Sequence, residues 1–365
     1  MSAHASIQAE DAYFSSNPPP KHLDAHTALA RDFINLHAQA GRRLVLVTSG
    51  GTTVPLEKQT VRFIDNFSAG TRGATSAEYF LEAGYAVIFL HRQFSLLPYS
   101  RHYSHSTDCL LDFLNEGEDG RVGVRDDGKI LGVLRKYRRA KDQNMLLTLP
   151  FVNIGDYLHE LRSIAQLMQP LGPSGLLYLA AAVSDFFVPM DRMSEHKIQS
   201  TDIADKLKDN GNNDNNNNNN NNDKNNKKKQ EQQQQRLIVD LDPVPKFLKN
   251  LVDGWAPHGM IASYKLETDP SILVLKARYS LERYQHHLVI GNLLSTRKYE
   301  VVFVSPGRED RWLRVPRKGG WGEAEGRPLR AEELPSQDPE EEIEALIIPA
   351  VAELHEEHIA RFKKE

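Results

Sequence analysis

The sequence predicts an α/β fold of Rossmann type, with an open, mostly parallel sheet and helices on both faces. Short apolar runs alternate along the chain with amphipathic segments of helical period, and this alternation is typical of βαβ units. The runs are continuously apolar, as expected for strands that helices cover on both sides. Polar and glycine-rich segments follow several of these runs, where open α/β sheets bind their ligands.

Six segments are predicted strands because each is a short run of mostly apolar residues. They are residues 43–48, 86–90, 176–180, 260–264, 288–291 and 300–304. Four segments have the period of amphipathic helices, namely residues 71–84, 156–169, 270–284 and 340–362. The first of these helices ends on a glycine, and the third follows Asp269 as an N-cap with Pro270 at its first position.

The domain organisation is predicted to be simple. A flexible N-terminus at residues 1–23 precedes a single domain at residues 24–365. Residues 206–235 are rich in Asn, Gln and Lys and almost free of apolar side chains. Such a tract cannot bury enough surface to offset its ordering entropy, so it is predicted to be a disordered insertion. It is either an interaction tract or a tolerated loop expansion. Residues 306–342 are predicted to form a polar loop.

Composition limits the function classes. The chain has 365 residues, a formal net charge of −4 and one cysteine, so an internal disulfide framework and a multi-cysteine zinc site are excluded. The charge gives no general reason to bind nucleic acid. Cys109 lies among leucines and is predicted to be a buried thiol. No run of eighteen apolar residues occurs, so we expect a cytoplasmic protein without a membrane partner.

A first polar cluster follows the first predicted strand. Ser49, Gly50 and Gly51 form the strand-to-loop turn in "VTSGGT", and "DNFSAGTRG" opens the next helix. In the latter, Asn66 supplies a neutral amide, and the other residues that let backbone N–H groups and a hydroxyl approach an anion are Ser68, Gly70 and Gly73. The spacing matches neither common phosphate-loop motif. An anion site and a capped helix after a glycine turn therefore stay open at this point.

Further clusters follow other predicted strands. "LAAAVSD" places the backbone N–H groups of Ala180, Ala181 and Ala182 where a carbonyl or oxyanion could accept from them. The other candidates are Asp185 after the same strand, Lys197 in "SEHKIQS", Lys265 and Glu267 in "SYKLETD", and Asn292 in "IGNLLSTR". Because parallel strands end at one edge of a sheet, these clusters together predict one pocket.

The histidine-rich segments predict no metal site. "HEEH" at residues 355–358 has three-residue spacing where the zinc-protease helix needs four, so it is interpreted as a polar surface. His286 and His287 precede a strand and are interpreted as structural. No site made only of protein groups is predicted, and Mg²⁺ is expected to arrive with a nucleotide.

Several motifs together resemble one family. "VTSGGTTVPLE", "VRFIDNFSAGTRGATSAEYFLEAGY", "LAAAVSDFFVP", "EHKIQS", "LDPVPK", "SYKLETD" and "GNLLSTRK" occur in this order. They resemble phosphopantothenoylcysteine synthetase (phosphopantothenate–cysteine ligase) of the eukaryotic, single-function type, from about residue 24 to residue 304 apart from the Asn-rich tract, and again in the last helix. The resemblance implies a ligase that forms an amide bond between 4′-phosphopantothenate and cysteine in coenzyme A biosynthesis.

The resemblance also implies a mechanism. The phosphopantothenate carboxylate attacks the α-phosphate of a nucleoside triphosphate, and cysteine then attacks the resulting acyl-nucleotidylate. Lys197 is implied to neutralise phosphate, Asn66 to contact the acyl-phosphate, and the N–H groups near Ala181 and Ala182 to stabilise the acyl oxygen. The implied nucleotide contacts are Gly50, Ser68, Gly70, Gly73, Asp185, Tyr264 and Asn292, with Lys265 and Lys276 as further phosphate contacts.

The resemblance leaves some partners open. ATP with Mg²⁺ is favoured over CTP, and a homodimer is expected through residues 94–153. In that region Arg135, Lys136, Arg138 and Arg139 are either substrate-phosphate contacts or a solvated face.

Two other function classes are compatible with the predicted fold, an oxidoreductase and a non-catalytic interaction protein. A flavin or nicotinamide oxidoreductase lacks the G-x-G-x-x-G fingerprint that its cofactor needs, so neither cofactor is expected. A non-catalytic interaction protein could use the Asn-rich tract.

Overall fold

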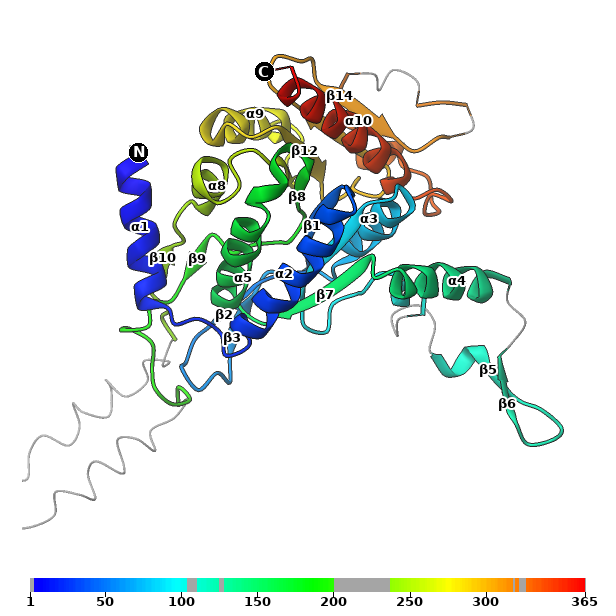
Figure 1. Cartoon of the computed structure of the whole chain (residues 1–365), viewed down its shortest axis with the longest axis horizontal. Helices are drawn as coiled ribbons and strands as arrows, with labels where there is room; N and C mark the ends of the chain where they lie inside the picture. The colour runs from blue at the N-terminus through cyan, green and yellow to red at the C-terminus, as the bar shows by residue number, and fades with distance from the viewer. Residues whose placement is uncertain are drawn as a thin grey trace, which may run out of the picture. The chain divides into compact units, whose positions relative to one another are not determined.

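The computed structural model describes residues 3–103, 110–124, 128–199, 237–317, 319–321 and 326–364 (Figure 1). Cys109 and the predicted insertion at 206–235 lie outside the described residues. Where the sequence predicted one domain, the chain divides into two compact units. The first comprises Met1–Thr53, Asp65–Ser184 and Pro245–Glu365, and the second comprises Val54–Ile64 and Asp185–Val244.

An eight-stranded sheet forms the centre of the first unit. Its strand order is β14-β13-β12-β11-β8-β1-β4-β7. The strands are β1 (Leu44–Ser49), β4 (Ala86–Arg92), β7 (Leu146–Phe151), β8 (Gly175–Leu179), β11 (Met260–Glu267), β12 (Leu288–Leu293), β13 (Glu300–Val304) and β14 (Arg311–Arg314). Only β13 and β14 pair antiparallel with their neighbours within this sheet. The predicted open, mostly parallel α/β sheet is confirmed.

The strand order reverses at β1. From β1 the chain proceeds outward through β4 and β7 on one side, and then through β8, β11 and β12 on the other. Strand β1 pairs parallel with both β4 and β8. The carboxyl ends of β1 and β8 therefore form the topological switch point, the usual ligand position in such sheets.

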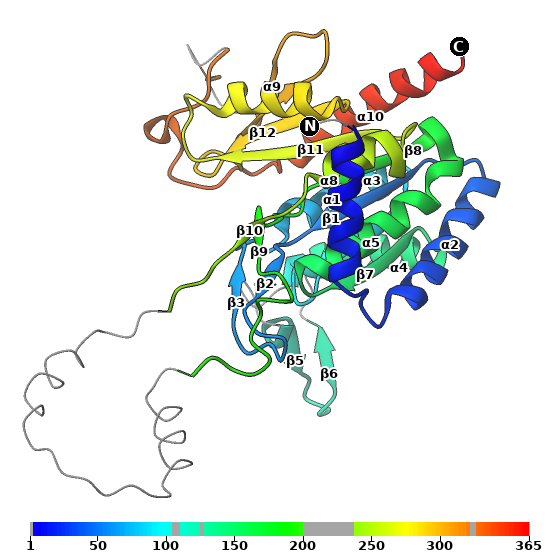
Figure 2. The same ribbon diagram turned by 90° about the vertical axis from the view of Figure 1, so that its left-hand side faces the viewer.

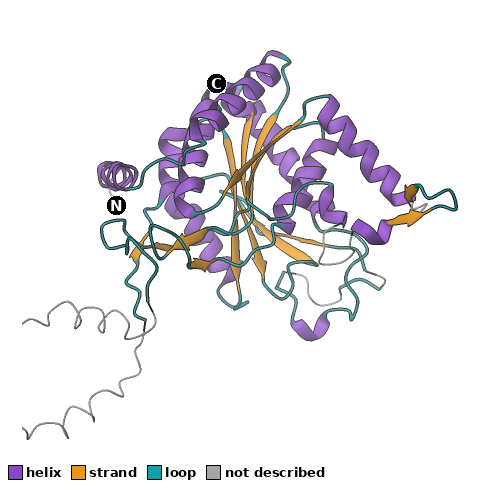
Figure 3. Cartoon of the chain, turned by 90° about the horizontal axis from the view of Figure 1, so that it is seen from below, coloured by secondary structure: helices purple, strands orange, loops and turns teal. Residues whose placement is uncertain are grey.

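Helices cover both faces of the sheet (Figure 3). α3 (Thr71–Glu82) and α10 (Glu344–Phe362) pack on one face, where alternate strand residues such as Val45, Leu288 and Ile290 form a core with them. α9 (Leu273–Tyr284) packs on the other face against Val289 and its neighbours. α2 (Leu23–Gln39) and α5 (Ile154–Leu167) pack against each other and contact β7.

The predicted elements differ from the observed ones mainly at their ends. β11 and β12 continue further than predicted, so Lys265, Glu267 and Asn292 lie within strands rather than after them. The N-cap of α9 is Ile272, whereas Asp269 accepts hydrogen bonds from the backbone and hydroxyl of Ser271. A short Asx turn therefore precedes this helix in place of the predicted cap.

The N-terminal segment is the largest difference from the prediction. Residues 1–23 were expected to be flexible, yet α1 (Ala3–Ser16) forms there and lies beside α8 (Phe247–Asn250; Figure 2). Two adjacent aromatic residues anchor it. Tyr13 is buried against Phe247, and the Arg162 guanidinium lies 3.9 Å from the centre of the Phe14 ring. The partners lie more than 140 residues away, so local patterning could not indicate this packing.

The predicted polar loop at 306–342 also contains regular structure. It includes β14 and the short 3₁₀ helix η6 (Ala331–Glu333), and it buries Val315 and Leu329. The region 94–153 contains the hairpin strands β5 (Leu114–Glu116) and β6 (Val122–Val124) and helix α4 (Gly128–Asp142). It ends in β7, which belongs to the central sheet.

The short elements complete the chain. The 3₁₀ helices are η1 (Ser100–Tyr103), η2 (Leu110–Phe113) and η3 (Gln169–Ser174), and η4 (Leu251–Trp255) is a π-helix. The second unit contains the paired strands β9 (Phe186–Phe187) and β10 (Asp242–Pro243). Strands β2 (Thr53–Pro55) and β3 (Phe63–Asp65) form another two-stranded sheet. Among the described residues, no helix has both the length and the apolar character needed to cross a membrane.

The interpretation of "HEEH" as a polar surface is wrong for its first histidine. His355 is fully buried on the inner face of α10, with Nδ1 bonded to the Tyr85 hydroxyl and Nε2 donating to the Pro173 carbonyl at 2.9 Å. Because a carbonyl only accepts, Nε2 carries the proton in this pairing. His286 is confirmed as structural, since it is buried and bonded to Ser263.

Candidate functional site

The turn from β1 into α3 requires glycine for its backbone conformation. Gly50 has φ 85° and Gly70, the N-cap of α3, has φ 84°. Side chains rarely tolerate this left-handed region. The sequence thereby fixes a sharp turn at the carboxyl end of β1 and a helix that starts directly beside it.

Gly51 and Gly73 are required because their surroundings leave no room for a side chain. A Cβ on Gly51 would lie 1.6 Å from the Asn66 carbonyl oxygen, and one on Gly73 would lie 2.4 Å from Ser49 Oγ. Protein atoms already occupy the space that these glycines leave. The lack of a side chain at these two positions therefore lets segments of the loop pack against each other, and it leaves no room for an anion there.

Thr52 joins the first two sequence clusters. This buried residue donates its backbone N–H to the Ala182 carbonyl at 2.9 Å. Its hydroxyl accepts from the Asn66 side-chain amide at 3.4 Å and from the Ser184 N–H at 3.0 Å. The structure thus brings Asn66 beside the segment after β8, as predicted, and Thr52 is the link that sequence reasoning missed.

The predicted oxyanion donors are already paired. The Ala181 N–H donates to Thr48 Oγ1 at 3.1 Å, and the Ala182 N–H donates to the Gly50 carbonyl at 2.8 Å. The β1–β8 pairing simply continues beyond the strand ends. An oxyanion hole needs donors that point at the reacting atom, so the assignment of these two N–H groups as free donors is wrong for this conformation.

The start of α3 is the better anion site in this turn. Among the described residues, no side chain caps this twelve-residue helix, and Ser68 Oγ lies 3.4 Å from the Gly70 N–H. The first N–H groups of a helix have no intrahelical acceptor, and its dipole favours negative charge there. The site at the switch point therefore fits a phosphate group.

Residues after β4 complete this edge and were missed by sequence reasoning. Arg92 pairs with Asp65 at 2.6 Å, and the Ser95 side chain lies 3.2 to 3.3 Å from where a Cβ on Gly50 or Gly70 would stand. Ser95 Oγ is buried and has no hydrogen-bond partner in the described part of the chain. The sequence "FLHRQFS" could have indicated them, because it is a polar segment after a predicted strand, like the segments that were predicted to form the pocket.

Two aromatic side chains are almost fully exposed beside this turn. Phe67 follows Asn66 and is 93% exposed, and Phe94 precedes Ser95 and is 96% exposed. An exposed phenylalanine gains nothing from the fold itself, so both are candidates for contact with a ligand or partner.

Tyr264 is held by the protein rather than presenting a free hydroxyl. Its hydroxyl pairs with that of Tyr178, and the Arg72 guanidinium lies 5.7 Å from the centre of its ring. Burial, followed by the neighbouring Tyr178, raises the pKa of Tyr264 well above its usual value. Its hydroxyl is therefore neutral and occupied, so only the face or edge of the ring is offered to a base.

Arg72 connects this tyrosine to α10. Its guanidinium donates to Glu344 at 2.7 Å and to the Arg297 carbonyl at 2.5 Å. Burial opposes the charge on Arg72, but Glu344 and the two phenols raise its pKa. A cavity of about 270 Å³ lies alongside, and Thr71, Arg72 and Thr75 of α3 are part of its lining.

Lys265 and Lys276 share one carboxylate. Each ammonium lies 3.2 Å from an oxygen of Glu267, and both side chains are more than a third exposed. Asn292 is buried on the adjacent strand, opposite Leu266 in the β11–β12 register. The predicted clusters in "SYKLETD" and "IGNLLSTR" therefore meet at the ends of β11 and β12.

Lys197 and Asp185 belong to the second unit. Lys197 is exposed, and the backbone beside it is anchored because the Ile198 N–H donates to the buried Glu57 carboxylate at 3.3 Å. Backbone N–H groups of Arg62, Val61 and Ile198 lower the pKa of Glu57. Asp185 is exposed and accepts from the Val244 N–H through its carbonyl.

Comparison with known proteins identifies the family. No protein-family model matches the chain. Phosphopantothenate–cysteine ligase CAB2 of Saccharomyces cerevisiae is 46% identical over 357 residues, which cover 97% of this chain and 88% of the relative. The human phosphopantothenate–cysteine ligase is 41% identical over 302 residues, 81% of this chain and 86% of the relative.

A solved structure agrees with these relatives. It is a histidine-to-alanine mutant of Cab2 in complex with phosphopantothenate-cysteine, with a TM-score of 0.78 and 42% identity over 97% of this chain and 99% of that one. The resemblance seen in the sequence motifs is confirmed, and the relatives support neither of the alternative function classes. The chain belongs to the phosphopantothenate–cysteine ligase family.

Proposed function

We propose that this protein joins 4′-phosphopantothenate to cysteine through an acyl-nucleotidylate, with release of nucleoside monophosphate and pyrophosphate. The observation that carries the proposal is the uncapped start of α3 at the switch point, with Asn66 held beside it by Thr52. This arrangement supplies backbone donors for a phosphate and a neutral amide for the acyl-phosphate.

Each group has a proposed task. The first N–H groups of α3 bind a phosphate of the nucleotide, and the neutral Asn66 amide holds the acyl-phosphate without competing as a nucleophile. Lys197 neutralises phosphate charge during formation of the acyl-nucleotidylate, and Glu57 positions it by fixing the adjacent Ile198 N–H. Since the Ala181 and Ala182 N–H groups are paired, the unpartnered Ser95 hydroxyl is a better candidate than they are for a donor at this edge.

We propose ATP, rather than CTP, as the nucleotide. The aromatic ring of Tyr264 does not distinguish one base from the other, and the choice of ATP rests on the likeness to the eukaryotic type. Mg²⁺ would be brought by the triphosphate and would neutralise its charge. The proposed location is the cytoplasm, where reducing conditions keep the thiol of the substrate cysteine free.

The products distinguish this mechanism from its alternatives. With phosphopantothenate, cysteine, Mg²⁺ and ATP, AMP and pyrophosphate should each form in a 1:1 ratio with phosphopantothenoylcysteine. Mass spectrometry of the acyl product and chromatography of the nucleotides measure this ratio, and parallel reactions with CTP measure nucleotide preference. Formation of ADP and phosphate would contradict the mechanism, because it would indicate an acyl-phosphate intermediate without a nucleotide.

We also propose a homodimer formed through the region 94–153. A largely apolar cavity of about 440 Å³ lies between α4 and the segments around it, and Val133, Leu134 and Tyr137 are part of its lining. Leu134 and Tyr137 are also 40% and 42% exposed. Exposed apolar surface of this kind marks association sites, and α4 offers it on one side together with the solvated basic face of Arg135 and Arg138.

Charge placed in this apolar surface should dissociate the dimer. Leu134→Glu would put an uncompensated carboxylate into a dry interface, so we expect a monomer at micromolar concentration in analytical ultracentrifugation. Arg135→Gln, on the solvated face of the same helix, serves as the matched control and should stay dimeric. A wild-type chain that sediments as a monomer, or a Leu134→Glu variant that stays dimeric, would contradict the assigned interface.

A further inference from the structure

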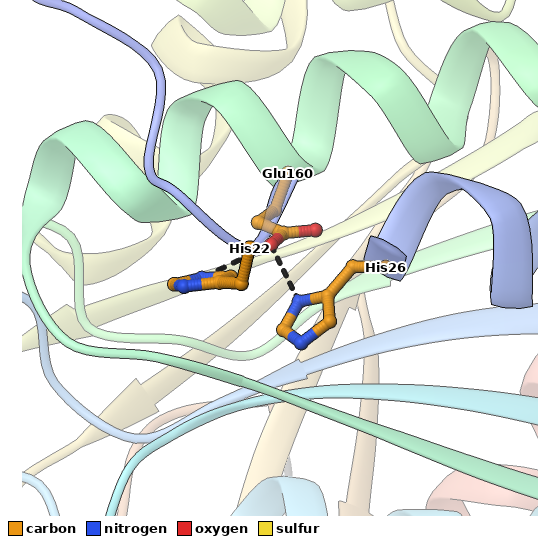
Figure 4. Close-up of side chains that lie close together, drawn as sticks. All are labelled: His22, His26 and Glu160. Atoms are coloured by element: carbon orange, nitrogen blue, oxygen red, sulfur yellow. Dashed lines mark hydrogen bonds and ion pairs between the residues drawn. The ribbon is translucent and has the colours of Figure 1, made fainter. Parts of the chain in front are cut away.

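Three ionisable side chains converge between α2 and α5, apart from the ligation site (Figure 4). His22 is the N-cap of α2 and His26 lies one turn later, whereas Glu160 comes from the second turn of α5. His26 Nδ1 lies 2.6 Å and His22 Nε2 lies 3.4 Å from Glu160 Oε1. All three ligand atoms lie within 4.8 Å of one another.

The cluster contains two buried polar atoms that lack a hydrogen-bond partner among the described residues. The Glu160 side chain is fully buried. Its Oε2 and the Nε2 of His22 have no hydrogen-bond partner among the residues that the structure describes. Buried carboxylate oxygens and imidazole nitrogens are normally satisfied, so two unpartnered atoms in one small cluster call for a ligand.

The geometry suits a transition metal. Histidines at positions i and i+4 point to the same side of a helix, as in helical zinc sites. Zinc–nitrogen distances of about 2.0–2.1 Å place neighbouring ligands of a tetrahedral ion roughly 3.3–3.5 Å apart, close to the separation of His22 Nε2 and Glu160 Oε1. The shorter contact between His26 and Glu160 is a hydrogen bond that the ion would replace.

The electrostatics also favour a cation. Glu160 becomes negatively charged when a bound cation displaces its proton, and Asp156 lies one turn earlier on α5. Burial, reinforced by Asp156, raises the pKa of Glu160 to about 8, and burial lowers the pKa of His26. Burial therefore disfavours a proton on His26, and a bound metal would displace the proton that burial favours on Glu160. Imidazole ligands select zinc over Mg²⁺.

We propose that His22, His26 and Glu160 bind a divalent zinc ion that fastens α2 to α5. Three protein ligands leave the fourth position of a tetrahedral ion for a water molecule, and the His22 side chain, which is 37% exposed, lies partly at the surface. The site is distinct from the ligation chemistry, and its role is to stabilise the packing of these two helices, which Thr27 and Ser163 continue one turn further with a 2.7 Å hydrogen bond.

The test uses the full chain freed of metal by a chelator and then titrated with zinc. One zinc ion should bind per chain, with a dissociation constant of about 1 µM or tighter by calorimetry. At 100-fold excess over that constant, the melting temperature should rise by a few degrees, because zinc binds only the folded site. Substitution with Co²⁺ should give the visible absorption of a tetrahedral site, and Mg²⁺ at the same concentration should produce neither effect.

Variants separate this site from adventitious binding. Glu160→Gln keeps the shape and removes the charge, and His26→Gln removes one imidazole. Each should weaken zinc binding at least 10-fold to 100-fold while the chain stays folded. Asp24→Asn, an exposed change in the same turn of α2, is the matched control and should bind like the wild type. Zinc affinity that is equal in Glu160→Gln and the wild type, or an absence of saturable binding, would overturn the proposal.

Discussion

Replacing Lys197 with glutamine is expected to slow formation of the acyl-nucleotidylate by roughly 10²–10³-fold, a typical effect of removing one group that stabilises transition-state charge. The side chain is exposed, and its neighbouring backbone is fixed by the buried Glu57. The charge is therefore available to substrate, while its position is set by the fold. In rapid-quench experiments with labelled phosphopantothenate, this variant should accumulate little intermediate, with or without cysteine.

Asn66→Asp should impair the second step instead. The carboxylate would repel the acyl-phosphate and could no longer donate to it, and the hydrogen bond to Thr52 Oγ1 would have to reverse its direction. Intermediate should form and then react slowly with cysteine, so that it accumulates. Thr52→Val keeps Asn66 but removes the hydroxyl that accepts from its side chain. This variant should also accumulate intermediate, but less than Asn66→Asp does.

Lys58→Gln is the matched control for Lys197. Lys58 lies in the same unit and pairs with Glu195 at 3.2 Å on the surface, so both half-reactions should keep wild-type rates. Unchanged far-ultraviolet circular dichroism and an unchanged melting temperature would show that each variant is folded. If Lys197→Gln and Asn66→Asp slow both steps equally and accumulate no intermediate, the two role assignments are wrong.

A second large effect is expected from acid. Burial lowers the pKa of His286 and His355 to about 4 each, whereas histidine in an unfolded chain titrates near 6.5. Between these values the unfolded chain binds more protons than the folded one. The free energy of unfolding therefore decreases as the pH falls from about 6.5 to 4, by up to about 1.4 kcal/mol per pH unit for each histidine. Each contributes about 3 kcal/mol over this window.

Other groups modify this dependence. Burial, reinforced by His358, also lowers the pKa of His287 to about 4, so it acts in the same direction. Glu160 acts in the opposite direction, because its raised pKa adds stability as the pH falls from about 8 to 4.5. A whole domain is stable by only about 5–15 kcal/mol. The histidines thus remove a substantial part of the stability of the first unit as the pH falls from about 6.5 to 4.

Urea unfolding at several pH values measures this effect. Trp255, Trp312 and Trp321 all lie in the first unit, so their fluorescence reports on it. His286→Gln and His355→Gln should each give a shallower dependence of unfolding free energy on pH, in a buffer with chelator. His196→Gln, at an exposed position, should keep the wild-type slope. Identical slopes in all three variants would refute the assignment.

The sequence by itself determined the architecture and the place of the site. Continuous apolar runs showed a doubly covered parallel sheet, and the glycines at positions 50 and 70 showed a sharp turn at its first strand end. These features are local, because burial on both faces and a left-handed backbone each leave a direct trace in residue type. The motifs that follow the strands were also sufficient to identify the family.

The tertiary structure alone decided which polar atoms are free. The Ala181 and Ala182 N–H groups looked available in the sequence, yet Thr48 and Gly50 occupy them. The sequence did not indicate a role for Ser95, yet its buried hydroxyl has no hydrogen-bond partner among the described residues. Hydrogen-bond satisfaction depends on segments that are distant along the chain, so residue type cannot reveal it.

The same reason explains why the N-terminal helix and the proposed metal site were not predicted. Tyr13 is buried against Phe247, and the carboxylate of Glu160 lies 134 residues beyond the histidine that it contacts. The spacing of His22 and His26 was visible in the sequence, but two histidines one turn apart indicate a site only when a third ligand reaches them. That third ligand comes from the packing of α2 on α5, which no local pattern encodes.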